Sequence, residues 1–102
     1  MSLSNDQKKS LRSIGHKLNP VVTVAEKGLS ENVMEEINRT LDDHELIKVK
    51  FQINDREAKV ELINEMCKAQ KAELVQQIGK VALILRRNPQ ANPNLSNLSR
   101  PH

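Results

Sequence analysis

The chain has 102 residues, of which 37% are hydrophobic and 28% charged, and its formal net charge is +3. This length suits one small domain with a single modest core, and no apolar run approaches the ~18–20 residues that span a bilayer. Cys67 is the only cysteine, which excludes an internal disulfide framework and fits a reducing compartment. The opening residues lack the profile of a signal peptide, so we expect a cytoplasmic protein.

The charges are distributed unevenly along the chain. Residues 1–29 carry five basic and two acidic side chains, whereas residues 30–47 carry one basic and six acidic side chains, a net charge of −5. Residues 48–72 and 73–102 are again net basic. This pattern predicts two faces of opposite sign, one of which could meet a polyanion. The alternative, that the charges only solvate helices, stays open at this point.

The first predicted element is a helix from about Asn5 to His16. Ser4 and Gln7 have the spacing of a capping box. Leu11, Ile14 and Leu18 form one narrow apolar stripe. Gly15 and then Asn19-Pro20 end the helix, because the residue before a proline avoids the helical region.

A strand, a turn and a second helix follow. The β-branched run Val21–Val24 favours a strand, and Ser30 is a good N-cap for a helix from about Glu31 to Asp43. Between them lies Ala25-Glu26-Lys27-Gly28, where a turn can present backbone N–H groups to an anion.

Apolar and polar residues alternate from Leu46 to Ile53, which predicts a strand with one buried and one basic face. A third helix is predicted from about Arg56 to Gln70, with one apolar stripe that includes Cys67. The predicted order of elements so far is αβαβα.

Residues 73–85 are typical of a hairpin that turns at Gly79-Lys80. On its first arm Leu74, Gln76 and Ile78 alternate, and the apolar second arm is expected to be covered on both faces. From Asn88 onward Asn, Pro and Ser dominate, so residues 88–102 are expected to form a disordered tail. The sum is one α/β domain over residues 1–87, of αβαβαββ order, with a four-stranded mixed sheet whose strand order stays open.

No constellation of residues points to catalysis, and we expect no enzyme, metal, cofactor or small-molecule substrate. His44 with Glu45, Asp42 and Asp43 could be drawn as a metal or acid–base cluster, but solvation of a helix end explains it better. Cys67 is better explained as a small core residue than as a nucleophile.

Nucleic-acid binding has more support in the residues. Lys27 and Gly28 join a flexible cation to a strand-to-helix turn, and Phe51, the only Phe, Tyr or Trp, lies on the buried side of its strand. Any RNA binding should therefore depend on phosphates and shape, and weaken with salt. The wider electrostatic footprint consists of Lys8, Lys9, Arg12, Lys17, Lys48, Lys50 and Arg56.

Several short motifs, spread over residues 3–87, occur together. They are Leu3-Ser4 with Gln7-Lys8, the run from Leu18 to Val22, the run from Lys27 to Ser30, the run from His44 to Lys50, Asp55-Arg56-Glu57, and the run from Gln77 to Lys80. In these motifs the chain resembles the YhbY-type bacterial proteins, stand-alone forms of the CRM (chloroplast RNA splicing and ribosome maturation) domain.

The resemblance implies an RNA-binding domain similar in fold to the C-terminal domain of translation initiation factor three. It implies ribosomal RNA in large-subunit precursors as the partner and a role in ribosome assembly. We also expect no membrane partner and a monomer. It also implies a GxxG-like loop at Ala25, Glu26, Lys27 and Gly28. Ala25 replaces the first glycine and Glu26 would repel a phosphate, so contact is expected to rest on Lys27 and Gly28. The alternative is a protein-interaction module that docks on a ribosomal protein through the acidic second helix or the tail.

Overall fold

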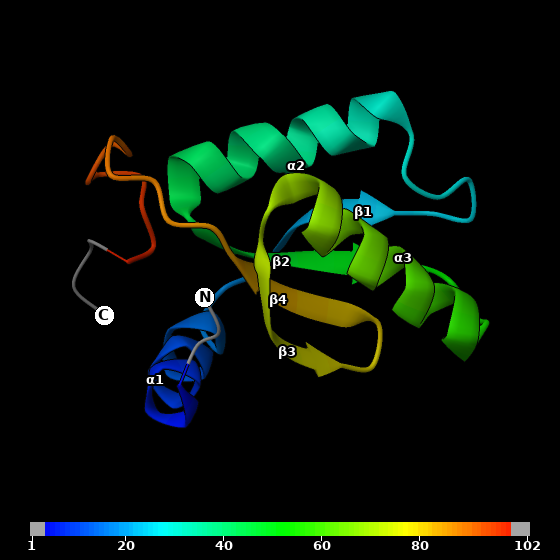
Figure 1. Cartoon of the computed structure of the whole chain (residues 1–102), viewed down its shortest axis with the longest axis horizontal. Coiled ribbons are helices and arrows are strands. Elements are labelled where there is room, and N and C mark those ends of the chain that lie inside the picture. Colours follow the sequence, from blue (N-terminus) through cyan, green and yellow to red (C-terminus); the bar gives the residue numbers. More distant parts are fainter. Residues whose placement is uncertain (1–3, 99–102) are drawn as a thin grey trace.

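The computed structural model describes residues 4–98 and contains the seven predicted elements in the predicted order (Figure 1). The elements are α1 (Asn5–Gly15), β1 (Pro20–Val24), α2 (Glu31–His44), β2 (Leu46–Phe51), α3 (Arg56–Gln70), β3 (Glu73–Ile78) and β4 (Val81–Leu85). Their ends lie within two residues of the prediction, the largest difference being that β2 stops at Phe51 and not at Ile53.

Side-chain caps fix where the helices begin. The backbone N–H of Gln7 donates to Ser4 Oγ at 3.1 Å, and the backbone N–H of Ser4 donates to Gln7 Oε1 at 2.9 Å, which confirms the capping box. Ser30 Oγ accepts from Val33 N–H at 3.3 Å at the start of α2. Asp55 caps α3 in the same way, so each helix start satisfies backbone donors that the helix itself leaves unpaired.

The four strands form one mixed sheet in the order β1-β2-β4-β3. β1 runs parallel to β2, and β4 runs antiparallel to both of its neighbours. β4 therefore lies inside the sheet, and Ala82 to Leu85 are all buried, as the apolar second arm predicts. The α/β class and the mixed sheet are confirmed, while the expected likeness to the initiation-factor domain stays a prediction.

Each face of the sheet carries its own hydrophobic cluster. α2 and α3 cover one face around Val49, Phe51, Ile37 and Met66. α1 covers only part of the other face, where Leu11 packs with a smaller cluster that includes Leu46, Val75, Leu83 and Leu85. The rest of that second face, which we call the open face, is defined by the alternate residues Thr23, Lys48, Lys50, Gln76, Ile78 and Val81.

α1 approaches the sheet closely at its last residue, Gly15. A Cβ placed there would lie 2.5 Å from Leu83 Cδ2, closer than real Cβ contacts come. The sequence suggests only that Gly15 ends the helix, whereas the structure shows that it also lets α1 pack against β4. This contact fixes the height of the basic helix above the sheet.

The side chains of β3 do not alternate between the two faces of the sheet as the sequence predicts. The register shifts between Leu74 and Gln76, so Leu74 packs into the α2 and α3 cluster while Val75 joins the smaller cluster. The bulge directs the adjacent residues Val75 and Gln76 to the same face. Leu74, Gln76 and Ile78 therefore do not share a face, because an inserted residue reverses the alternation.

Residues 88–98 also differ from expectation, because the structure packs them against the domain. Ser96 Oγ donates to Glu45 Oε1 at 2.8 Å, and the Asn97 side chain donates to the carbonyl of Leu46 at 2.6 Å. Ser96 and Asn97 are buried, and Leu98 contacts the α1 cluster. Disorder is expected because the segment has few apolar residues, but composition does not show which polar side chains are held in place by hydrogen bonds. Residues 1–3 of the expected domain and 99–102 of the expected tail lie outside the described residues.

Candidate nucleic-acid interface

The loop between β1 and α2 is a tight turn. Gly28 N–H donates to the Ala25 carbonyl at 2.9 Å, and Ser30 N–H donates to the Gly28 carbonyl at 3.1 Å. Glu26 and Lys27 form the exposed tip of this turn, directly before the capped start of α2. The turn thus places Lys27 directly before the N-terminus of α2, but the N–H groups of Gly28 and Ser30, which the sequence predicts to face an anion, are bonded within the turn.

The left-handed position in this turn falls on Gly28. Its φ is 78°, whereas Ala25 has no positive φ. A Cβ added at Gly28 would lie 3.8 Å from Leu62, an ordinary contact, so conformation and not space favours glycine here. Ala25 therefore fits the turn without backbone strain, and the acidic Glu26 is the remaining obstacle to a phosphate at that end.

Lys48 and Lys50 stand on the open face in the middle of the sheet, both half-buried. Lys48 Nζ donates to the Leu18 carbonyl at 3.0 Å, which ties the loop after α1 to β2. An ammonium has three donors, so Lys48 keeps two others for a ligand. Lys50 lies in register with Thr23 on one side and Val81 on the other.

α1 and the residues just after it supply the next group of cations. Lys9, Arg12 and Lys17 are exposed, and Lys8 is half-buried. α1 lies on the same side of the sheet as Lys48, but toward the end opposite the turn at residues 25–28 (Figure 1). The structure therefore does not gather the predicted footprint into one patch.

Arg56 lies near the same end of the sheet as the turn at residues 25–28. Gln52 N–H donates to the Val24 carbonyl at 2.8 Å, so the segment leading into α3 lies beside the end of β1. Arg56 is exposed in the first turn of α3, next to the acidic Glu57. Lys80, which the sequence analysis did not include, reaches the same region and its Nζ donates to Asn54 Oδ1 at 3.1 Å.

Most of the predicted acidic block lies on the other side of the molecule, on α2. Two of its acids already have partners: Asp42 forms an ion pair with Arg86 at 2.8 Å, and the buried Glu45 accepts hydrogen bonds from Asn88 N–H and Ser96 Oγ. The expected opposition of a basic and an acidic face is thus visible in the fold. The more basic side of the sheet is the one that carries α1 and the open face, and the turn lies at one end of the sheet, next to α3.

A match to a protein-family model identifies the family of this chain. The family model of the CRS1 / YhbY (CRM) domain matches residues 3–86, nearly the whole of the predicted domain. The chain belongs to the CRM domain family.

Relatives of this CRM domain span most of its length. A protein of Pseudomonas aeruginosa named "Probable RNA-binding protein" is 52% identical over 100 residues, covering 98% of this chain and 96% of that protein. One of Haemophilus influenzae, named "RNA-binding protein", is 43% identical over 94 residues, 92% of this chain and 95% of its own. The solution structure of a Staphylococcus aureus protein, described as a candidate RNA-binding protein, has a TM-score of 0.77 at 35% identity, covering 89% of this chain and 95% of that one.

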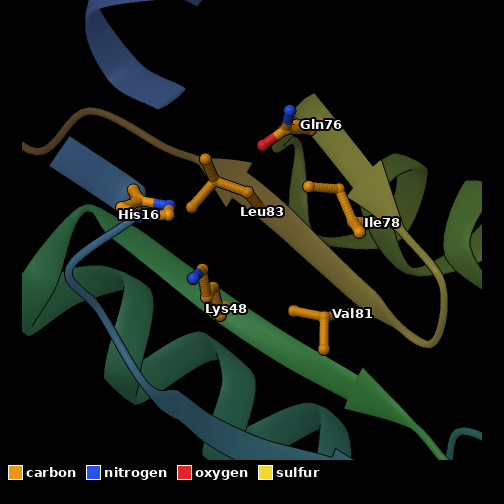
Figure 2. Close-up of a pocket in the computed structure, with 6 residues that line it drawn as sticks. All are labelled: His16, Lys48, Gln76, Ile78, Val81 and Leu83. Atoms are coloured by element: carbon orange, nitrogen blue, oxygen red, sulfur yellow. The ribbon is translucent and has the colours of Figure 1, made fainter. Parts of the chain in front are cut away.

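A pocket in the open face of the CRM domain was not foreseen from the sequence. It has a volume of about 160 Å³ and is lined by His16, Lys48, Gln76, Ile78, Val81 and Leu83 (Figure 2). Ile78 is 66% exposed. The bulge in β3, which directs Gln76 to this face, leaves no clear signal in the sequence, but an exposed apolar residue beside a hairpin turn could have been noted.

The structure also shows the surroundings of Cys67 and His44, the other groups considered in the sequence. Cys67 is half-buried against the larger cluster, and burial, followed by the nearby Glu73 carboxylate, raises the pKa of its thiol from 9.0 to about 11. His44 Nδ1 lies 2.7 Å from the Leu95 carbonyl and holds the C-terminal segment. Among residues 4–98, no three His, Cys, Asp or Glu side chains form a group that could hold a metal ion. None of the helices described is long and apolar enough to cross a membrane.

Proposed function

We propose that this CRM domain binds RNA through the side that carries α1 and the open face, together with the turn at residues 25–28 at one end of the sheet. The observation that carries the proposal is the separation of charge between the two faces of the sheet. Most of the predicted cations lie on the open face or on and just after α1, while the acids of α2 lie on the other side; Lys27 lies at one end of the sheet, and Arg56, at the start of α3, lies outside this surface. The names of its full-length relatives support RNA as the ligand. Flexible lysines and arginines are the side chains that phosphates attract most strongly.

The turn and α1 contact different phosphates of the RNA. Lys27 places its ammonium on a phosphate while Gly28 lets the backbone approach, and Glu26 keeps the phosphate away from the other end of the turn. Lys8, Lys9, Arg12 and Lys17 neutralise phosphates at the opposite end of the sheet, and Lys48 and Lys50 bridge the two. An RNA that contacts all three parts must run along the sheet, so a structured RNA fits better than a short fragment.

The finer part of the proposal concerns which RNA is bound. We propose ribosomal RNA in large-subunit precursors, with the protein acting as a monomeric ribosome-assembly factor in the cytoplasm, without catalysis and without a cofactor. The resemblance to YhbY-type proteins supports this role, and the unpaired thiol of Cys67 fits a reducing compartment.

The experiment compares the wild-type protein with the double variant Lys27→Gln/Lys50→Gln in binding to deproteinised large-subunit ribosomal RNA. Lys48 is left intact, because its replacement would also remove the hydrogen bond from its Nζ to the Leu18 carbonyl. Removing two phosphate contacts should weaken binding at ~100 mM salt on the order of tenfold and lower the slope of log K against log salt by about one to two.

Lys68→Gln/Lys71→Gln is the matched control, because both lysines are exposed at the end of α3 on the covered side of the sheet. It removes the same charge and should change RNA affinity far less. Equal losses in the two double variants would contradict the proposed surface, and no binding by the wild-type protein would contradict RNA binding itself. Crosslinking in cells should recover precursor ribosomal RNA of the large subunit.

The rival proposal is a protein-interaction module that uses α2 or the C-terminal segment. Its basis is the acidic block, but the Asp42–Arg86 ion pair and the burial of Glu45 reduce the charge that α2 can offer. In the same experiment the rival predicts little or no salt-dependent binding to deproteinised RNA.

A further inference from the structure

The pocket in the open face combines an apolar floor with polar walls. Val81, Leu83 and Ile78 provide the floor and one side, and His16, Lys48 and Gln76 stand around them (Figure 2). These residues come from β4, β3, β2 and the end of α1, so four separate parts of the fold meet there. Such a mixture of apolar surface and a few polar groups is typical of a small-ligand site.

The size of the pocket limits its occupant. Its volume of about 160 Å³ is close to that of an engineered cavity of ~150 Å³ in another protein, which holds a single benzene ring. One planar ring system therefore fits, whereas a base pair or a folded peptide segment does not.

The polar groups favour a ring with hydrogen-bonding edges that is attached to an anion. Lys48 keeps two N–H donors beside its bond to Leu18, and Gln76 offers both a donor and an acceptor. His16 is exposed and provides a flat ring at one wall. The lining residues include no carboxylate, and Lys50 stands next to Val81 in register, where a phosphate joined to the bound ring could lie.

We propose that this pocket binds one unpaired nucleobase of the RNA. The inference rests on the proposed function and deepens it, since it names a single-stranded segment as part of the RNA that is recognised. The base lies on Val81 and Leu83 against Ile78, stacks on the His16 ring, and meets Gln76 and Lys48 with its polar edge. Single-stranded RNA is recognised by this combination of stacking, including on histidine, and edge contacts. The absence of Trp and Tyr from the chain does not exclude it.

The test uses the double variant Gln76→Ala/Ile78→Ser, which changes the pocket without changing the net charge. Ile78 is largely exposed, and neither side chain is a partner in the larger core cluster, so the fold should persist. Affinity is measured for a 12-nucleotide single-stranded RNA of mixed sequence, and for the same length of sugar–phosphate backbone carrying no bases. His16→Ala provides a second variant from the opposite wall.

The wild-type protein should bind the RNA with bases more tightly than the abasic strand. Both pocket variants should lose on the order of tenfold on the RNA with bases, the contribution of about one stacked base, and nothing on the abasic strand. Val60→Ser, an exposed apolar residue on α3, is the control and should lose nothing on either strand.

Unchanged affinity of the pocket variants for the RNA with bases would overturn this inference. An equal loss on both strands would also overturn it, because the effect would then come from the phosphates or the fold. In either case wild-type binding that depends on Lys27 and Lys50 would leave the proposed function standing, so the two failures can be told apart.

Discussion

Several charged side chains in this CRM domain stabilise the fold, although their sequence pattern suggests only a charged surface. Arg86, which follows β4, donates to the carbonyls of Asn38 and Gln70 and forms the ion pair with Asp42. It thereby joins α2 and the end of α3 to the end of the sheet. Lys48 similarly ties the loop after α1 to β2. The charge of a residue can be read from the sequence, but its hydrogen-bond partners depend on how distant segments pack.

The burial of Cys67 predicts that its thiol reacts slowly with alkylating reagents. Its thiol pKa is raised from 9.0 to about 11, so at pH 8 the thiolate fraction should be about a hundredfold lower than for an ordinary cysteine. Alkylation by iodoacetamide should therefore be slow in the folded protein at pH 8 and accelerate as the pH rises toward 11. The rate at pH 8 should increase by about two orders of magnitude when the chain is unfolded in urea. A rate that is the same in folded and unfolded protein would contradict the burial of Cys67.

At the level of elements, the C-terminal segment is the part that composition describes least well. Its order depends on Glu45, a residue with a φ of 63° that ends α2. The carboxylate of Glu45 accepts from Asn88 N–H and Ser96 Oγ, and its carbonyl accepts from Arg86 N–H at 2.9 Å. One buried acid thus organises the chain on both sides of residue 88.

Ser96→Ala tests whether this arrangement contributes to stability. It would leave one oxygen of the buried Glu45 carboxylate without its hydroxyl partner, which should lower the free energy of unfolding by about 1–3 kcal/mol. Ser13→Ala, an exposed change within α1, should leave it within about 0.5 kcal/mol. Urea denaturation measures both. If Ser96→Ala has no effect, the disordered tail expected from composition describes the segment better.

The elements themselves follow from the sequence, because local signals fix them. The capping box at Ser4, the alternation in β2 and the glycine at residue 79, with a φ of 56°, each act within a few residues. The β3 bulge, the Gly15 contact with Leu83 and the pocket depend on residues far apart in the chain. Much of the candidate site could therefore be predicted as a set of residues, but not the two groups into which the structure divides them.

For the whole molecule, the arrangement of charge has a geometric consequence. α1 and the turn at residues 25–28 lie toward opposite ends of a long axis of 36 Å (Figure 1). Exposed charges separated by more than the Debye length, about 8 Å at physiological salt, are largely screened from each other, so the cations of α1 and those near the turn are expected to attract phosphates almost independently. The lysines of the open face and the proposed base pocket lie between them. The RNA-binding surface is therefore expected to extend along one side of the protein.

The most direct test of this surface is a lysine footprint. Acetylation of each lysine is measured by mass spectrometry with and without bound ribosomal RNA. Lys9, Lys17, Lys27 and Lys50 should become protected because phosphates cover them, whereas Lys68 and Lys71 at the end of α3 should react at an unchanged rate. Protection of Lys68 and Lys71 with continued reactivity of Lys9 and Lys27 would contradict the proposed RNA-binding side.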